Sequence, residues 1–226
     1  MIPTAKLRVL LGGTFDPVHN GHLRAAVELC ESLGAQQVDL VPARDPVHRG
    51  PPGAPALARK AMLELAVQQE PCLSVNAIEL EADRESYTLF TLQELREEIG
   101  SEMPLVLVMG MDAFLDLETW KGWRSLLDYS HLLVMRRPGY QPVFSSQLES
   151  FYMAHCVEQV NQLLALSAGK ICLFEQTPLE VSATQVRDII SSGHNPRYLV
   201  PDSVWDYIQE NELYGFTGSK VSRSAR

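Results

Sequence analysis

Residues 12–22 read GGTFDPVHNGH, and they join a short apolar run to an amphipathic pattern. The run, residues 7–11, predicts a buried strand, and the pattern after it repeats apolar residues at helical spacing. The expected inward face of that helix is Leu23, Ala26, Val27, Cys30 and Leu33. A strand leading directly into a helix near the N-terminus is typical of an α/β protein.

The same stretch has the chemistry of an anion site. Gly12 and Gly13 lack a Cβ, so a ligand can approach the backbone closely. Asn20 is expected to cap the helix, whose first turn offers unpaired N–H groups and the positive end of the dipole. His19 and His22 lie three residues apart and share a face of that turn. We interpret the stretch as a phosphate site, although a tight turn also explains the glycines; a zinc pair lacks a third ligand at metal spacing.

Composition limits the classes of protein. The chain has 226 residues, 46% of them hydrophobic, which is enough for one good-sized core. A net charge of −9 argues against a general nucleic-acid-binding protein. The four cysteines are scattered and are interpreted as buried, reduced thiols. Neither a secretory leader nor an apolar run of about 18 residues is present, so we expect a cytoplasmic protein that does not enter a membrane.

Strand and helix signals alternate along the rest of the chain. Strands are predicted at 37–42, 73–80 (one or two), 105–109, 131–135 and 170–174, and helices over 56–69, 86–99 and around 186–190 and 204–208. The run 105–109 is the most apolar and should be central. The helix over 56–69 should turn Ala58, Ala61, Met62, Leu65 and Ala66 inward, and the helix over 86–99, capped by Ser86, should bury Leu92, Leu95 and Ile99. The alternation predicts a doubly wound parallel sheet with helices on both faces.

We expect a single domain over residues 1–216. Residues 140–168 have a weak pattern and are interpreted as a variable insertion. Residues 217–226 are expected to form a disordered tail.

A second cluster of functional residue types spans residues 182–187, SATQVR. Ser182 or Thr184 could simply cap the helix that follows. Arg187 lies off the apolar face of Val186 and Ile190, so a surface arginine is the more economical interpretation of this cluster alone.

The two clusters together resemble the paired motifs of the nucleotidyltransferase superfamily, which transfers AMP or CMP from a nucleoside triphosphate. Residues 12–22 match its first motif over their whole length, and residues 181–187 match its second. The resemblance implies a Rossmann-like sheet and catalytic roles for His19, His22 and Arg187 at the triphosphate. The ATP-binding residues that it implies are Gly12, Gly13, Thr14, Phe15, His19, Gly21, His22, Gly110, Ser182, Thr184 and Arg187.

Further stretches resemble the nicotinate mononucleotide adenylyltransferase family: DPVHR at 45–49, SYT at 86–88, GMD at 110–112, TWK at 119–121, RRPG at 136–139 and LY at 213–214. Taken alone, DPVHR is also explained as a solvated loop, SYT as a helix cap and Trp120 as a core residue, and Val47 stands where the family usually has proline. The resemblance implies that the mononucleotide is bound by His48, Arg49, Tyr87, Thr88, Asp112, Trp120, Lys121 and Arg137. It implies that Trp120 stacks on the pyridine ring and that backbone amides of 87–88 and 120–121, both taken as helix beginnings, receive its carboxylate.

The implied reaction transfers AMP from ATP to nicotinate mononucleotide, giving deamido-NAD and pyrophosphate in NAD biosynthesis. Mg²⁺ is expected to come with ATP and to have few protein ligands, without a dedicated metal site. The alternatives are an adenylyltransferase acting on nicotinamide mononucleotide or another phosphorylated acceptor, and a non-catalytic nucleotide sensor. The oligomeric state stays open, a homodimer included.

Overall fold

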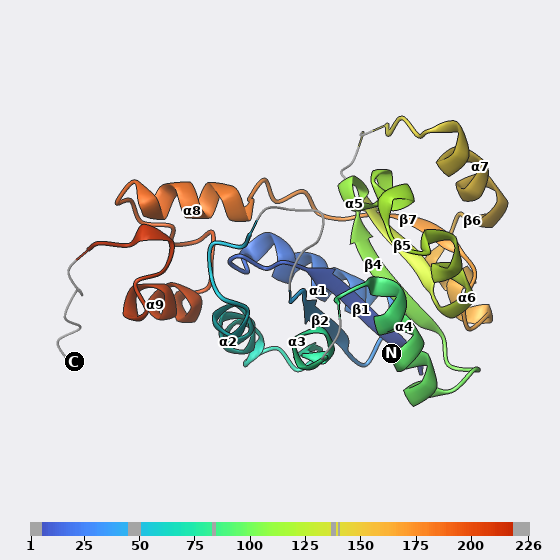
Figure 1. Ribbon diagram of the computed structural model, residues 1–226, viewed down its shortest axis with the longest axis horizontal. Coiled ribbons are helices and arrows are strands. Elements are labelled where there is room, and N and C mark those ends of the chain that lie inside the picture. The colour runs from blue at the N-terminus through green and yellow to red at the C-terminus, as the bar shows by residue number, and fades with distance from the viewer. Residues whose placement is uncertain (1–5, 45–50, 83–84, 137–138, 140, 219–226) are drawn as a thin grey trace.

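A seven-stranded parallel sheet forms the centre of the molecule. The computed structural model describes residues 6–44, 51–82, 85–136, 139 and 141–218 (Figure 1). The strand order is β3-β2-β1-β4-β5-β7-β6, and every described pair is parallel. The strands are β1 (Arg8–Gly13), β2 (Val38–Pro42), β3 (Leu73–Val75), β4 (Leu105–Gly110), β5 (His131–Arg136), β6 (Cys156–Val157) and β7 (Ile171–Glu175). The predicted central strand, β4, is the middle one.

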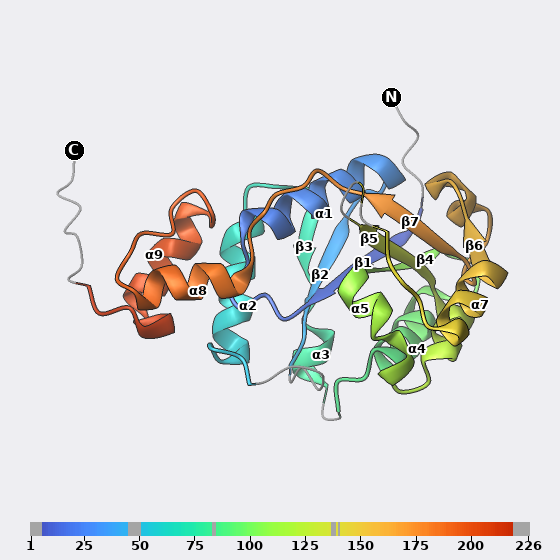
Figure 2. The same cartoon turned by 90° about the horizontal axis from the view of Figure 1, so that it is seen from above.

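Helices cover both faces of the sheet, as the doubly wound prediction requires. Alternate residues of the inner strands enter two separate apolar clusters: Val9 and Leu11 of β1 lie in one and Leu10 in the other. The first cluster contains α1 (Asn20–Leu33), α2 (Ala56–Val67), α8 (Ala183–Ser191) and α9 (Asp202–Glu210). The second contains α4 (Thr88–Ile99), α5 (Met111–Leu115), α6 (Leu126–Tyr129) and α7 (Ser146–His155). Figure 2 shows α1 on one side of the strands and α4 and α5 on the other.

Three local expectations were wrong. The segment predicted as one or two strands at 73–80 contains β3 and then a helical turn, α3 (Ile78–Glu81). Helix α4 has Tyr87 at its N-cap, without a side-chain cap, because the Ser86 hydroxyl donates to the Glu79 carbonyl instead. The buried residues of α2 are Arg59, Met62, Leu63 and Val67, so only Met62 of the expected inward set is fully buried. Ala58 and Ala66 are partly buried against the same cluster, so the inward face overlaps the expected one but also includes Arg59, whose guanidinium has acceptors inside the protein.

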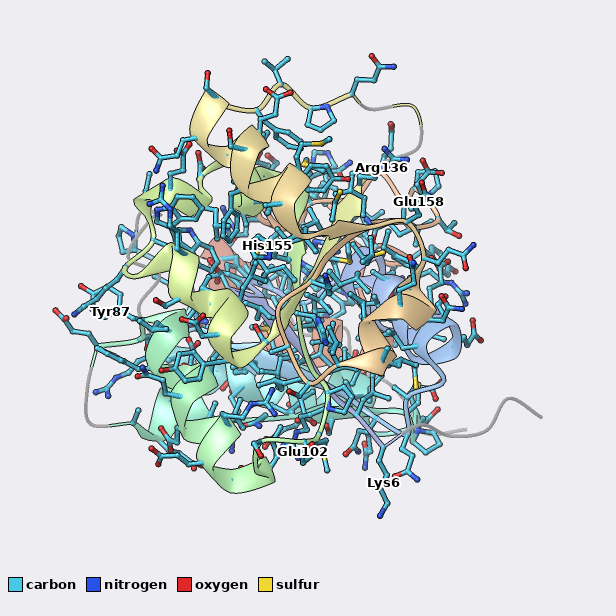
Figure 3. The ribbon with its side chains drawn as sticks, turned by 90° about the vertical axis from the view of Figure 1, so that its right-hand side faces the viewer. Lys6, Tyr87, Glu102, Arg136, His155 and Glu158 are labelled. Carbon is cyan, nitrogen blue, oxygen red and sulfur yellow. The ribbon has the colours of Figure 1, made fainter. Side chains whose placement is uncertain are left out.

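The segment 141–168, the described part of the predicted insertion 140–168, extends the far edge of the sheet. It contains α7, the short edge strand β6 and a 3-10 helix, η3 (Val160–Ala165), which the sequence pattern did not predict. His155 at the end of α7 lies 3.1 Å (Nδ1) from the Gly169 carbonyl, and Figure 3 looks onto this end of the molecule, with His155 and Glu158 labelled. Its description as a variable insertion stays a prediction.

The C-terminal helices lie at the opposite end. Figures 1 and 2 both place α8 and α9 beside α2, and the Ser203 hydroxyl donates to the Leu65 carbonyl across 3.2 Å. The remaining 3-10 helices are η1 (Leu117–Thr119), η2 (Trp123–Ser125) and η4 (Leu213–Gly215). Most of the predicted tail, 219–226, lies outside the described residues.

The four cysteines are free. Cys30 and Cys172 are buried as expected, whereas Cys72 and Cys156 are partly exposed.

Candidate active site

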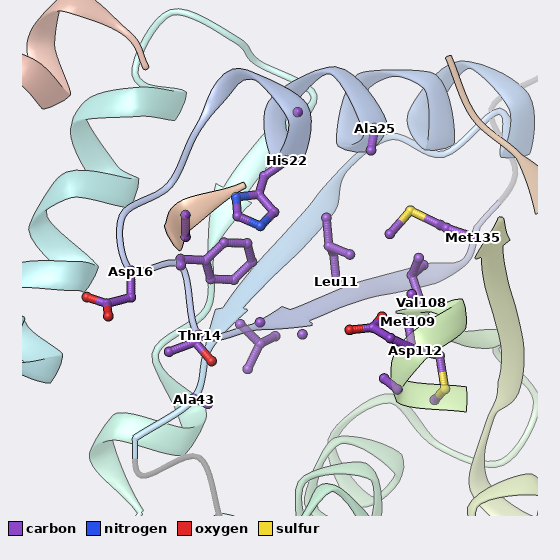
Figure 4. Close-up of a pocket in the computed structure, with 18 of the residues that line it drawn as sticks. Leu11, Thr14, Asp16, His22, Ala25, Ala43, Val108, Met109, Asp112 and Met135 are labelled. Carbon is purple, nitrogen blue, oxygen red and sulfur yellow. The ribbon is translucent and has the colours of Figure 1, made fainter. Parts of the chain in front are cut away.

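A cavity of about 1020 Å³ opens at the carboxyl ends of β1 and β4. The strand order reverses between these two strands, which is where open α/β sheets bind their ligands. Every predicted site residue that the structure describes lines this cavity. Figure 4 shows His22 reaching down from α1 beside the end of β1, with Thr14 below it and Asp112 across the cavity.

The loop after β1 needs glycine for two different reasons. A Cβ on Gly13 would lie 2.9 Å from the ring of Phe15, which folds back over it. Phe15 is 2% exposed and has a φ of 50°, an uncommon backbone conformation for a bulky residue. A Cβ on Gly12, by contrast, would meet nothing within 4 Å. Gly12 therefore leaves space in the cavity wall, where a ligand can reach the backbone.

His19 and His22 are stacked, with ring centroids 3.6 Å apart. The backbone amide of His19 donates to Nδ1 of His22 across 3.4 Å, so a neutral His22 carries its proton on Nε2. Burial lowers the pKa of His19 from 6.5 to about 4, so this imidazole is neutral at pH 7. The pair therefore presents one buried neutral ring and one partly exposed ring with an N–H donor.

The start of α1 is held by the other end of the chain. His19, not Asn20, is the N-cap residue. The Asn20 amide donates to the Leu199 carbonyl (2.8 Å) and its side chain to the Tyr198 carbonyl (2.7 Å), which draws Asn20 away from the capping position. The amide of His22 donates to the His19 carbonyl, which leaves Gly21 as the residue of this turn whose N–H has no acceptor among the described residues.

Helix α8 brings the second motif to the same cavity. Ser182 is its N-cap and accepts a hydrogen bond from the Gln185 amide (3.1 Å). Arg187 is not the plain surface residue of the sequence interpretation. Its Nη1 donates to the Asp16 carbonyl (2.7 Å) and its Nη2 to the Thr184 hydroxyl (3.2 Å). The guanidinium thus joins the two motifs.

Asp16 organises the loops behind the cavity, a role that sequence reasoning missed. Its carboxylate accepts hydrogen bonds from the amides of Gly53 (2.7 Å) and Ala54 (3.0 Å) and from the Tyr214 hydroxyl (2.9 Å). Figure 4 shows the carboxylate turned away from His22. No local pattern in the sequence indicates partners 37 to 198 residues away.

Arg59 is the second missed residue. Its side chain is fully buried, and its three nitrogens donate to the carbonyls of Ala54 (3.3 Å), Thr14 (2.7 Å) and Arg44 (2.9 Å). These acceptors come from the β1–α1 loop and from the segments that follow β2. Arg59 therefore fixes the carbonyl of Thr14, so the backbone of the first motif is held from behind.

The predicted nicotinate side is formed by the start of α4 and the turn after η1. Lys121 Nζ lies 4.4 Å from the ring centroid of Tyr87, so the two segments touch. Trp120 is not at a helix beginning: it ends η1, and its amide donates to the Leu117 carbonyl (2.9 Å). The Tyr87 amide is likewise engaged, by the Glu85 carbonyl (2.9 Å). The amides of Thr88 and Lys121 have no acceptor in the part of the chain that the structure describes.

Three predicted residues, His48, Arg49 and Arg137, lie outside the described residues. Within the described ranges, no group of three or more His, Cys, Asp or Glu side chains could hold a metal ion. Among the same residues, no helix is long and apolar enough to cross a bilayer.

Comparison with known proteins identifies the family. Residues 10–189 match the cytidylyltransferase-like family. A Hahella chejuensis protein named "Probable nicotinate-nucleotide adenylyltransferase" is 43% identical over 208 residues, which cover 92% of this chain and 95% of the relative. A Pseudomonas putida protein of the same name is 45% identical over 205 residues, 91% of this chain and 93% of the relative. This chain belongs to the nicotinate-nucleotide adenylyltransferase family.

Solved structures agree with membership of the nicotinate-nucleotide adenylyltransferase family at the level of the fold. The Plasmodium falciparum nicotinic acid mononucleotide adenylyltransferase complexed with NaAD superposes with a TM-score of 0.70 at 16% identity, covering 93% of this chain and 98% of that one. The same enzyme complexed with APC superposes with a TM-score of 0.65 at 17% identity, again covering 93% of this chain and 98% of that one. At these identities the likeness establishes the Rossmann-like nucleotidyltransferase fold.

Proposed function

We propose that this protein transfers AMP from ATP to nicotinate mononucleotide, releasing pyrophosphate and deamido-NAD in NAD biosynthesis. The observation that carries the proposal is a single cavity lined by both nucleotidyltransferase motifs and by the predicted nicotinate-side residues, in a chain of this family. Four free thiols agree with a reducing, cytoplasmic setting, which we propose as its location. We propose no partner beyond the substrates; a homodimer stays open.

The reaction needs positioning and charge neutralisation rather than a protein nucleophile. A phosphate oxygen of the mononucleotide attacks the α-phosphorus of ATP in line, and pyrophosphate leaves. The Nε2–H of His22 is proposed to donate to the reacting phosphate, and Arg187 to bind the triphosphate. The open amides at Gly21 and at the first turn of α8 add donors at positive helix ends.

ATP is proposed to bind as its Mg²⁺ complex. The described residues include no metal-binding group of three side chains, so the phosphates themselves would supply most of the oxygen ligands. The ion belongs to the substrate in this proposal.

The finer part of the proposal is that the enzyme prefers nicotinate mononucleotide, a carboxylic acid, to nicotinamide mononucleotide, an amide. The amides of Thr88 and Lys121 can donate to a carboxylate, which offers only acceptors. A nicotinamide must turn its own NH₂ toward one of these donors, and an unpaired buried polar group costs about 1–3 kcal/mol. We therefore expect nicotinate mononucleotide to be preferred by about 10- to 100-fold.

The test measures pyrophosphate release with ATP and Mg²⁺, and compares kcat/KM for nicotinate and nicotinamide mononucleotides. Trp120→Ala is the matched variant. Because both pyridine rings stack alike on Trp120, this substitution should lower kcat/KM for both mononucleotides and keep most of the ratio between the two kcat/KM values. Equal kcat/KM values would replace this assignment by a dual-specificity enzyme, and release only with another phosphorylated acceptor would identify a different adenylyltransferase. ATP binding without release for any acceptor would identify a nucleotide sensor.

A further inference from the structure

The hydrogen bonds of Asp16 come almost entirely from neutral donors. Two backbone amides and the Tyr214 hydroxyl approach its carboxylate at 2.7 to 3.0 Å. The nearest cation, Nη1 of Arg187, lies 3.6 Å from Oδ2 and donates instead to the backbone carbonyl of Asp16 at 2.7 Å. A buried aspartate beside an arginine ordinarily forms a close, often bidentate pair. Here that pairing is replaced by neutral hydrogen bonds.

Tyr214 remains protonated at its hydroxyl and therefore remains a hydrogen-bond donor. Burial raises the pKa of its hydroxyl, and the charge of Asp16 raises it further, so the proton stays on the oxygen. The residue reaches Asp16 from η4, 198 residues away, and holds a left-handed φ of 57°. Its ring lies 3.2 Å from the position that a Cβ on Gly53 would take, so the ring also fits closely against this segment. Asp16 and Arg187 line the cavity, whereas Tyr214 is not part of its wall.

We propose that Tyr214 is a positioning residue that keeps Arg187 available to the triphosphate. The hydroxyl donates to Oδ1 and so compensates part of the carboxylate charge that would otherwise draw the guanidinium onto Asp16. The hydrogen bonds of Arg187 then go to the Asp16 carbonyl and the Thr184 hydroxyl, both neutral, while the carboxylate oxygen Oδ2 stays 3.6 Å away, which leaves donors and charge for phosphate. Without the hydroxyl, Oδ1 loses a hydrogen bond and the carboxylate charge is less compensated, so we expect the guanidinium, 3.6 Å from Oδ2, to close onto Asp16. This inference rests on the proposed use of ATP.

The experiment measures MgATP binding by calorimetry without an acceptor, for the full-length wild type, Tyr214→Phe and Tyr198→Phe. Tyr198 lies in the loop before α9 with its side chain 90% exposed, so its variant controls for loss of a hydroxyl. We expect Tyr214→Phe to bind MgATP about tenfold more weakly, the loss typical of one hydrogen bond to a charged group. Tyr198→Phe should match the wild type. In kinetics, Tyr214→Phe should raise KM for ATP and leave KM for the mononucleotide within about twofold.

A double-mutant cycle separates positioning from general structural support. In an Arg187→Lys background, Tyr214→Phe should change MgATP binding less than twofold, because the hydroxyl acts through the guanidinium. Full additivity of the two losses, or wild-type MgATP binding by Tyr214→Phe, overturns the inference. Pyrophosphate release by the wild type with nicotinate mononucleotide tests the proposed function separately, because the binding experiment contains no acceptor.

Discussion

The two stacked histidines differ in burial, and this difference gives the two imidazoles different protonation and hydrogen bonding. His19 is 5% exposed and kept neutral by the low pKa that burial imposes, and its Nδ1 has no hydrogen-bond partner among the described residues. His22 is partly exposed, with Nδ1 occupied by a backbone amide. The reacting phosphate is therefore expected to meet Nε2–H of His22, while His19 supports that ring from below.

His22→Ala should lower kcat by about 10²- to 10³-fold, the typical loss for a donor that acts mainly in the transition state. KM for ATP should change less than kcat, and the fold should be intact, because the ring is not part of the buried core. Steady-state kinetics and circular dichroism check this, with the exposed His194→Ala as the control. A kcat near that of the wild type would remove His22 from the mechanism.

His19 predicts a pH dependence of stability. Its pKa is about 4 in the folded protein against the ordinary histidine value of 6.5, so the unfolded chain binds more protons between these values. Stability is therefore complete above pH 6.5 and falls as pH decreases toward 4. The loss from this group is about 1.5 kcal/mol between pH 6.5 and pH 5.

Urea unfolding at both pH values measures this loss, and His19→Asn should show a smaller one. The comparison with the variant is needed because burial also lowers the pKa of His131. Equal pH dependence in the wild type and the variant would show that His19 does not carry the effect.

At the scale of elements, the β1–α1 connection offers a matched pair of glycines. A methyl group on Gly12 enters open cavity space, so Gly12→Ala should keep the melting temperature and raise KM for ATP about tenfold. A methyl group on Gly21 would lie 2.9 Å from Val181 Cγ1 and 3.1 Å from His19 Nδ1. Gly21→Ala should therefore destabilise the protein by about 1–3 kcal/mol, as overpacking does.

Melting curves and ATP kinetics on the two variants test the contrast. The opposite result would contradict this account: a lower melting temperature for Gly12→Ala, and a raised KM for ATP without loss of stability for Gly21→Ala.

The order of elements followed from local patterns, because apolar periodicity reports burial in strands and helices. The central strand β4 and both motif helices were predicted in this way. The orientation of α2 was not, since periodicity counts Arg59 as polar although three carbonyls satisfy it inside. The candidate site residues were predicted from the two motifs and the further family-like stretches, and those that the structure describes line one cavity, but the Asp16 contacts depend on tertiary structure alone.

At the scale of the whole molecule, the last described turn supports the first motif. Besides the Tyr214–Asp16 hydrogen bond, Phe216 packs edge-on against Trp205, with ring centroids 5.3 Å apart. A chain that stops after Glu212 should lose MgATP binding and melt several degrees lower, because both contacts are removed. A chain that stops after Gly218 keeps both and should match the full-length protein. Calorimetry and melting curves compare the two truncations; equal behaviour would contradict the supporting role of this turn.

The contacts of Asn20 with Leu199 and Tyr198 have a consequence for synthesis on the ribosome. The first motif emerges early, yet the carbonyls that hold the start of α1 are translated about 180 residues later. At about 5–20 residues per second, that interval is on the order of 10 to 40 seconds. The start of α1, where the first motif lies, therefore lacks these two hydrogen bonds until residues 198 and 199 have been translated.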